Sequence, residues 1–317
     1  MSEKERKKVF KRATGLVFLK FFVWLSGLMS ISVIYSIGGF LGRLVSFFVS
    51  KHTKNAMESL TIAYPEKTID EKKKIIRDSF IFMGQCAFEL LKFSKNPDKF
   101  DNIYFENEEN LRNALKKGKG VIVVTGHMGN FPLMSLMMAK SGYNVNIVAR
   151  PMRDPKAEKY LATLREKCGM KTIHSYPRKE CISNILRSLR NNEIIIIQMD
   201  QNFGTGGVWV KFFGKLAATP VGAVVFALRS GAPIVPGYMY RVEKDNKLKH
   251  YIKFEKEHDM ILCDDKNETI LKNVITLTGI IESWIRFVPE QWSWIHKRWK
   301  SQPNDEIKKQ KYKIEQS

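Results

Sequence analysis

Residues 120–142, "GVIVVTGHMGNFPLMSLMMAKSG", change their pattern of apolar residues within a few positions. The continuous apolar run at 120–125 is typical of a strand that is buried on both faces. Pro132 then falls at or next to the first position of a helix, where its missing N–H costs nothing, and Gly142 is suited to end that helix. The stretch therefore predicts a buried strand that leads directly into a helix, the unit from which α/β proteins are built.

The same alternation continues along the chain. Strands are expected at 145–150, 171–175, 193–200, 208–214, 233–242 and 250–257. Helices are expected at 68–93, 107–118, 154–169, 178–192, from Thr219-Pro220 onward and through 273–290. The first of these helices opens with a capping box, in which Thr68 stands three residues before Glu71. The pattern predicts a mixed, mostly parallel sheet with helices on both faces.

The charge of the chain points to an anionic partner. Fifty-three Lys and Arg residues stand against thirty-two Asp and Glu residues, which gives a net charge of +21. Nucleic acid and an anionic membrane surface both suit such a charge. No nucleic-acid-reading motif accompanies it.

The N-terminal region decides in favour of the membrane. The first twelve residues carry six cationic side chains, and residues 21–42, "FFVWLSGLMSISVIYSIGGFLG", carry no charge. This length is about that needed to cross a hydrocarbon core of roughly 30 Å. We expect a basic N-terminus and a tilted or monotopic anchor helix over residues 1–45, one α/β domain over 46–303, and a solvated tail over 304–317. The domain is expected on the cytoplasmic side of the inner membrane. Its cationic side chains would also hold it against anionic lipid head groups.

The four cysteines are far apart and form no CxxC pair, and the six histidines form no HExxH motif. This distribution favours a reducing compartment and gives no indication of a metal site.

Three polar positions are expected to share one edge of the sheet. His127 follows the strand at 120–125, Arg150 ends the strand at 145–150, and Asp200 and Gln201 follow the strand segment at 193–199. In an open α/β sheet, ligands bind beyond the carboxyl ends of the strands. These residues are therefore the candidates for a functional site.

His127 is placed for general-base chemistry. Gly126 and Gly129 flank it and permit a tight turn, and Asn130 is a good N-cap for the following helix. The unpaired N–H groups at that helix start could stabilise a developing negative charge. A histidine beside them is suited to deprotonating a hydroxyl that attacks a carbonyl. Because no serine elbow is present, His127 would act on the acceptor alcohol directly.

Several motifs together resemble the late acyltransferases of lipid A biosynthesis, the lauroyl and myristoyl transferase family. They are "TGHMGNFP" (125–132), "IVARPMRDP" (147–155), "MDQNFGTGG" (199–207), "VKFFGKLAATPVGAVVFALRSGAPIVP" (210–236) and "PEQWSWIHKRWK" (289–300). The N-terminal anchor and residues 55–80 are similar as well, so the resemblance covers nearly the whole chain.

The resemblance implies a membrane-bound acyltransferase of the glycerolipid acyltransferase superfamily that needs no cofactor. It would move an acyl chain from acyl carrier protein or coenzyme A to a hydroxyl of a lipid acceptor, with His127 as general base and no covalent enzyme intermediate. Arg150 and Arg153 are similar to residues that would hold an acceptor phosphate. Asn130, Gln201 and Arg298 are further substrate-binding candidates. The tryptophans 292, 294 and 299 resemble the closing motif, for which an interfacial aromatic belt is the alternative interpretation.

One position departs from the family pattern. The motif is a histidine followed five positions later by Asp or Glu, and here that position is Pro132. Three interpretations stay open. A carboxylate from elsewhere orients His127, with Asp200 the first candidate and Glu89 the second; or His127 works without one at a lower rate; or the chain is a non-catalytic lipid-binding relative. The acceptor is expected to be a lipid A precursor, with a lysophospholipid or another glycolipid as the alternative.

Overall fold

A computed structural model describes residues 3–95, 102–152, 154–244 and 247–303 of the chain. The expected tail at 304–317 and the candidate Arg153 lie outside the described residues.

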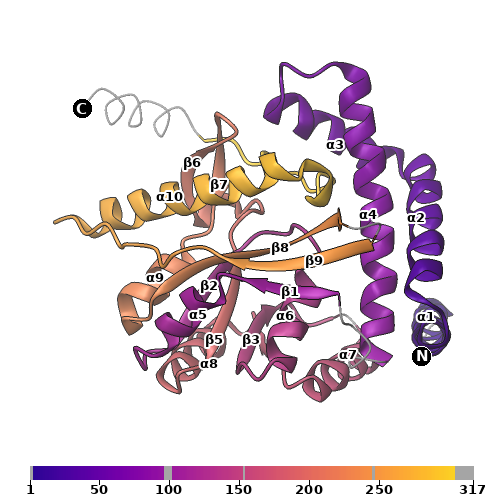
Figure 1. The fold of residues 1–317 in the computed structure, drawn as a ribbon, viewed down its shortest axis with the longest axis horizontal. Helices are drawn as coiled ribbons and strands as arrows, with labels where there is room; N and C mark the ends of the chain where they lie inside the picture. The colour runs from indigo at the N-terminus through magenta and orange to yellow at the C-terminus, as the bar shows by residue number, and fades with distance from the viewer. Residues whose placement is uncertain (1–2, 96–101, 153, 245–246, 304–317) are drawn as a thin grey trace.

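The centre of the described structure is a seven-stranded sheet (Figure 1). Its strand order is β1-β9-β8-β2-β5-β3-β4, and the pairs are parallel except for β8 with β9. The strands are β1 (Ile103–Glu106), β2 (Val121–Thr125), β3 (Val145–Ala149), β4 (Lys171–His174), β5 (Ile194–Gln198), β8 (Ile234–Lys244) and β9 (Lys247–Phe254). The mixed, mostly parallel sheet expected from the sequence is confirmed.

Alternate residues of β2 supply two different cores, one on each face of the sheet. Val121 and Val123 pack in the core to which α5 (Glu108–Leu115) and α6 (Phe131–Lys140) contribute. Ile122 and Val124 pack in the other core, with side chains from α8 (Arg178–Arg190), α9 (Gly222–Ser230) and α10 (Lys266–Phe287). A further helix, α7 (Pro155–Lys167), packs against β4. The expected helices on both faces are therefore present, which explains why the central strands are apolar throughout.

Two strands of the described structure are not predicted by the sequence pattern. β1 is an edge strand of only four residues, too short to show a strand period, and it pairs with β9. Residues Lys215–Thr219 form β7, which makes an antiparallel hairpin with β6 (Val208–Phe212). The prediction that a helix opens at Thr219-Pro220 is wrong by a few residues, because Thr219 ends this hairpin and α9 begins at Gly222.

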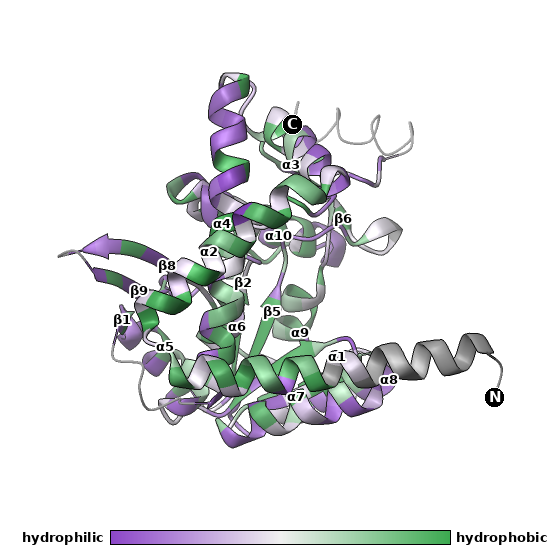
Figure 2. Ribbon diagram, turned by 90° about the vertical axis from the view of Figure 1, so that its right-hand side faces the viewer, coloured by the Kyte–Doolittle hydropathy of each residue, from purple (hydrophilic) through white to green (hydrophobic). Residues whose placement is uncertain are grey.

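The uncharged stretch at 21–42 is not one continuous helix, and this expectation is corrected. α1 (Glu3–Leu28) ends within it, and α2 (Ile31–Phe48) begins after Ser30. The hydroxyl of Ser30 accepts a hydrogen bond from the N–H of Val33 at 3.3 Å, which caps α2. Among the helices that the structure describes, α2 is the one that is long and apolar enough to cross a membrane. Figure 2 shows α2 and the C-terminal part of α1 on the face turned to the viewer, largely in the colour of hydrophobic residues.

α2 is packed closely along α4 (Ile69–Lys95), as Figure 1 shows, and α3 (Ser50–Ala63) connects the two. Glycines make this contact possible. A Cβ atom at Gly84 would lie 2.1 Å from the carbonyl oxygen of Gly38, and one at Gly42 would lie 2.2 Å from that of Phe80. α4 itself opens with the expected capping box, in which the Thr68 N–H donates to the Glu71 carboxylate at 2.8 Å. The apolar helix α2 is thus in close backbone contact with α4.

Candidate active site

His127 lies in the turn between β2 and α6, and the glycines beside it are required by close neighbours. Gly129 has a φ of +58°, and a Cβ atom there would lie 1.8 Å from the carbonyl oxygen of Met239. A Cβ atom at Gly126 would lie 3.2 Å from the carboxylate of Asp200. The turn is also held from outside, because the Gly129 N–H donates to the carbonyl of Gln291 at 2.8 Å. The two glycines therefore let the chain pass between β8 and the loop after β5.

The carboxylate of Asp200 binds His127 at two points. Its Oδ1 lies 2.7 Å from Nδ1 of the His127 ring, and its Oδ2 accepts the backbone N–H of His127 at 2.6 Å. Trp292 donates its indole N–H to the same Oδ2 at 2.7 Å. β2 and β5 are neighbours in the sheet, so residues that follow their carboxyl ends meet. This confirms the expectation that His127 and Asp200 share one edge.

Asp200 is held as a carboxylate although its side chain is fully buried. Burial raises its pKa, but the charge and hydrogen bonds of His127, together with the Trp292 indole, outweigh burial and leave the pKa below its ordinary value. A buried carboxylate on Nδ1 fixes the tautomer and orientation of an imidazole ring. Because Asp200 orients the His127 ring, no carboxylate is needed at position 132, where Pro132 occupies the first turn of α6.

Glu89 does not orient His127, so the second candidate for this task is corrected. Its side chain is fully buried on α4 and is bonded to Asn130, Arg241 and His250. It belongs to a separate polar cluster behind the turn. The sequence could not distinguish the two carboxylates, because α4 meets the sheet through packing that no local pattern records.

Asn130 stands at the N-cap position of α6, but its side chain makes no cap hydrogen bond. Its amide nitrogen donates to Glu89 at 2.8 Å and to the carbonyl of Cys86 at 3.2 Å. The residue is buried. The expectations that Asn130 caps the helix with its side chain and contacts substrate are therefore corrected.

The other candidate residues occupy different places. Arg150 is exposed directly after β3, which is the neighbour of β5 at the same edge of the sheet. Gln201 is half-buried beside Asp200. Arg298 is fully buried, and its guanidinium donates to the carbonyls of Ala218 and Gln201 and to Thr219.

Burial lowers the pKa of Arg298 to about 10. The prediction that Arg298 contacts substrate is corrected, because its donors hold the hairpin β6–β7 against the loop after β5. It is a positioning residue for the loop that carries Asp200.

The closing motif packs inside the protein and not at a membrane interface. Trp292, Trp294 and Trp299 are all buried in the core on the α10 side of the sheet. An aromatic belt exposes its rings, so that interpretation is wrong. The motif also supplies Trp292, which donates a hydrogen bond to Asp200. The sequence pattern does not predict this role. His296 of the same motif accepts the N–H of Asn202 at 3.1 Å, and burial lowers its pKa.

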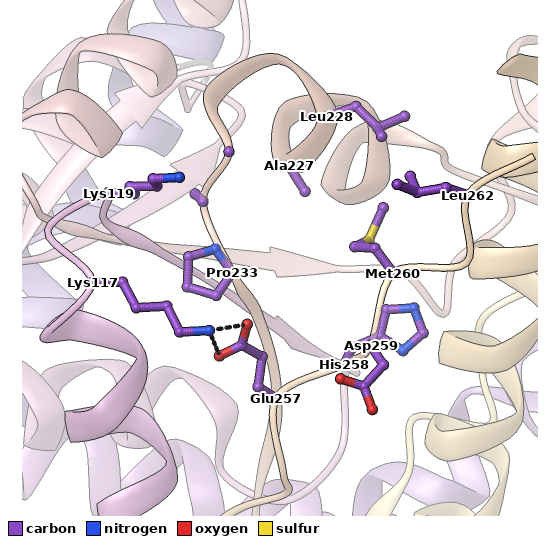
Figure 3. A pocket seen from close by; sticks show the side chains of 12 residues that line it. Lys117, Lys119, Ala227, Leu228, Pro233, Glu257, His258, Asp259, Met260 and Leu262 are labelled. Carbon is purple, nitrogen blue, oxygen red and sulfur yellow. Dashed lines mark hydrogen bonds and ion pairs between the residues drawn. The ribbon is translucent and has the colours of Figure 1, made fainter.

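A hollow lies at the opposite edge of the sheet from His127 (Figure 3). Residues that precede β2 and β8, among them Lys119 and Pro233, line it together with the segment after β9. Lys117 pairs there with Glu257 at 2.7 Å, and His258 is bonded to Asn273 at 2.7 Å. This hollow is therefore separate from the site around His127. In the parts of the chain that the structure describes, no group of three or more His, Cys, Asp and Glu residues is arranged to hold a metal ion.

The fold and the site define an α/β protein with a histidine–aspartate pair at the carboxyl edge of its sheet. Residues 3–301 match the model of a family described as the bacterial lipid A biosynthesis acyltransferases. The chain belongs to this family, and it is an acyltransferase that acts on a lipid acceptor.

Two relatives from Escherichia coli agree with this assignment over most of their length. The chain is 25% identical to the lipid A biosynthesis lauroyltransferase of Escherichia coli over 285 residues, which cover 89% of this chain and 90% of the relative. It is 25% identical to the lipid A biosynthesis palmitoleoyltransferase of the same organism over 288 residues, 89% of each chain. The crystal structure of the 1-acyl-sn-glycerophosphate acyltransferase from Thermotoga maritima is 14% identical, covers 79% of this chain and 97% of that chain, and superposes with a TM-score of 0.37.

Proposed function

We propose that the protein transfers a fatty acyl group from a thioester donor to a hydroxyl group of a lipid A precursor, with His127 as the general base. The observation that carries the proposal is the 2.7 Å contact between His127 Nδ1 and a fully buried carboxylate. This contact leaves Nε2 as the nitrogen that can receive a proton. The His127 side chain is 23% exposed, so acceptor can approach a ring whose partner is shielded from water.

The reaction takes place without a covalent enzyme intermediate. His127 Nε2 removes the proton of the acceptor hydroxyl as its oxygen attacks the thioester carbonyl carbon. The tetrahedral intermediate then collapses, the carbon–sulfur bond breaks, and the imidazolium returns the proton to the leaving thiolate. Asp200 stays ionised throughout and stabilises the imidazolium that forms between the two proton transfers.

The start of α6 supports the proposed oxyanion site. The first N–H groups of a helix have no partner within it and carry partial positive charge. The side chain of Asn130 is directed to Glu89 and does not occupy them. Phe131 begins this helix and packs edge-on against the His127 ring, with 4.9 Å between the ring centroids. Base and helix start are therefore in contact, as a single tetrahedral centre requires.

The names of the relatives favour a lipid A precursor as the acceptor, and they do not distinguish between two acyl donors. The lipid A lauroyltransferase and palmitoleoyltransferase of Escherichia coli each match 89% of this chain, whereas a phosphatidylinositol mannoside acyltransferase of Mycobacterium tuberculosis matches 42%. We infer a lipid A precursor as acceptor and acyl carrier protein, or coenzyme A, as the acyl carrier. Arg150, which directly follows β3, and Arg153 of the same sequence motif are proposed to bind a phosphate of the acceptor.

The proposed location is the inner membrane, with the α/β domain on its cytoplasmic side. Support comes from the apolar side chains that α1 and α2 leave exposed. They are Val17, Phe18, Phe21, Phe22, Trp24 and Leu28 on α1, and Val33, Phe40, Leu41, Leu44, Val45, Phe47 and Phe48 on α2. Exposed apolar area of this extent marks a membrane or partner surface. Because α2 is also packed on α4, we propose that the two helices lie in the membrane as part of the domain.

The test is acyl transfer by the purified full-length protein in detergent micelles. Wild type should move a radiolabelled acyl group from acyl carrier protein to a lipid A precursor, and His127→Ala should lose at least about 1,000-fold in kcat. Equal turnover by both proteins would refute His127 as the base. Binding of the acceptor without turnover by wild type would favour the non-catalytic relative. A preference for lysophospholipid or phosphatidylinositol mannoside would replace the proposed acceptor.

A further inference from the structure

Behind the active-site turn lies a buried cluster that the proposed reaction does not use. At its centre is Glu89 of α4, whose side chain is fully buried. One oxygen accepts the amide N–H of Asn130 at 2.8 Å. The other lies 3.2 Å from the Arg241 guanidinium and 2.8 Å from Nε2 of His250. The cluster therefore joins α4, the paired strands β8 and β9, and the residue that precedes α6.

Arg241 ties the same cluster to the turn by a second route. Its backbone N–H donates to the Gln291 side chain at 2.9 Å, and its carbonyl accepts from that side chain at 2.6 Å. The carbonyl of Gln291 in turn accepts the N–H of Gly129 at 2.8 Å. The cluster thus reaches the turn at two successive residues, Gly129 and Asn130.

Helix α2 also reaches this cluster. The hydroxyl of Tyr35 lies 3.3 Å from Nε2 of His250, and its ring lies 4.9 Å from the Arg241 guanidinium carbon. The helix that we propose to lie in the membrane and the active-site turn therefore contact the same buried charges.

A buried ion pair is a poor means of gaining stability. Removing two charges from water costs several kcal/mol per ion, and apolar side chains of similar volume often stabilise a protein as well or better. The two-point contact with the turn gives the cluster a different use, because it controls the direction of the Asn130 side chain.

That direction matters because Asn130 has an alternative. An asparagine at the N-cap normally accepts a hydrogen bond from the second or third N–H of its helix. Here the second residue of α6 is Pro132, which has no N–H, so the N–H of Leu133 is the ordinary target. A side chain turned to this N–H would accept its hydrogen bond. The N–H would then no longer be available to the oxygen on which the proposed reaction develops negative charge.

We propose that Glu89 is a positioning residue, which holds the amide of Asn130 away from α6 and so keeps the helix start open to the thioester carbonyl oxygen. The inference rests on the proposed function and adds a residue to it. What the cluster needs at position 130 is a hydrogen-bond donor toward Glu89. A residue that cannot donate across that distance, or that caps α6 instead, should lower kcat and leave the KM for the acyl donor nearly unchanged.

Two exchanges at position 130 test this requirement. Asn130→Ser supplies a short hydroxyl that is a good helix cap and cannot span the gap to Glu89. We expect its kcat to fall about 100- to 1,000-fold at every pH, the range for loss of one oxyanion-hole donor. Asn130→Asp places a second carboxylate against Glu89, and two such groups share a proton. While the proton is present it restores the donor, so kcat should be near that of wild type at the acid end of the pH profile and fall toward alkaline pH, where wild type is level.

Matched controls come from a second buried asparagine. Asn146 of β3 donates to Glu193 at 2.7 Å, at the other edge of the sheet from His127. Asn146→Ser and Asn146→Asp should leave kcat per folded molecule and its alkaline behaviour as in wild type. The folded fraction of every variant is measured by near-UV circular dichroism in the same micelles.

Including His127→Ala in the same assay separates the two hypotheses. If His127→Ala is inactive while Asn130→Ser keeps the wild-type kcat, or while Asn130→Asp lacks the alkaline loss, the positioning role is overturned and the proposed reaction stands. If His127→Ala turns over like wild type, the proposed function itself is wrong. Should Asn130→Ser fail to fold, the pH profile of Asn130→Asp decides alone.

Discussion

Trp292 donates its indole N–H to Oδ2 of Asp200 at 2.7 Å, across 92 residues of sequence. The contact brings the closing motif of the chain directly to the carboxylate that binds His127. A carboxylate accepting three hydrogen bonds is held both in place and in its charged form. The orientation of His127 therefore depends on a segment near the C-terminal end of the described structure.

Asp200→Asn should lower kcat by about 1,000-fold or more, because an amide cannot hold the productive tautomer of the imidazole and stabilise its charged form. Single-turnover transfer of a labelled acyl chain measures the effect on chemistry alone. Asp70→Asn, an exposed position on α4, is the control and should behave as wild type. A loss below about 10-fold would show that His127 does not need a carboxylate.

Trp292→Phe keeps an aromatic ring in the core and removes one of the three hydrogen bonds to Asp200. We expect kcat to fall by about 10-fold, the effect of one hydrogen bond to a charged group, with little change in KM. The matched variant is Trp284→Phe, which also removes an indole donor, at 3.2 Å from Glu255. If the two variants lose equal activity per folded molecule, the contact with Asp200 has no special role.

The stability of the protein should depend on Glu89 in acid. Burial raises the pKa of Glu89, but the neighbouring His250 and Arg241 outweigh it and lower the pKa to about 2. A carboxyl group whose folded pKa is lowered stabilises the protein above its unfolded pKa, and this contribution disappears as the pH falls through the folded pKa. For Glu89 the window runs from about pH 4.5 down to about pH 2.

In Glu89→Gln this acid-dependent part, on the order of 3 kcal/mol, should be missing from the free energy of unfolding. Denaturant titrations between about pH 2 and pH 6 compare it with wild type. Glu71→Gln, in the exposed capping box of α4, is the control and should keep the steep loss in acid that wild type shows. An equally steep loss in Glu89→Gln would assign the acid sensitivity to other groups.

Membrane association should depend on the outward face of α2. Phe47 and Phe48 are 72% and 77% exposed, and replacing both with aspartate removes apolar area and adds charge. We expect a shift of the protein from the pelleted to the soluble fraction in sedimentation with anionic phospholipid vesicles. Phe287→Asp changes a residue of α10 that is 59% exposed and should not alter the distribution. Equal pelleting of all three proteins would remove α2 from the membrane contact.

Much of the fold could be predicted from the sequence because its central strands are apolar on both faces. The run at 121–125 and its counterpart at 194–198 are recognisable without knowledge of their neighbours, and parallel order then places His127 and Asp200 together. β7 could not be predicted, because its alanines at 217 and 218 carry no strand period and are buried by the segment that contains Arg298.

The sequence predicts those parts of the candidate site that follow directly from the ends of single strands. The choice between Asp200 and Glu89 depended on the packing of α4, which meets the turn from behind. The buried state of Arg298 and the role of Trp292 likewise arise from contacts between segments about 80 to 90 residues apart. Local patterns describe which side chains could act, and long-range packing decides which of them meet.

The glycine contact between α2 and α4 has a practical consequence for anyone who wants this protein in aqueous buffer. Removing the apolar N-terminus up to Phe48 would strip a partner from α4 and uncover the backbone around Gly84. It would also delete Tyr35 beside His250. A shortened form that keeps its core has to begin before Ile31, so solubility is better sought by changing the outward phenylalanines of α2 than by cutting the helix away.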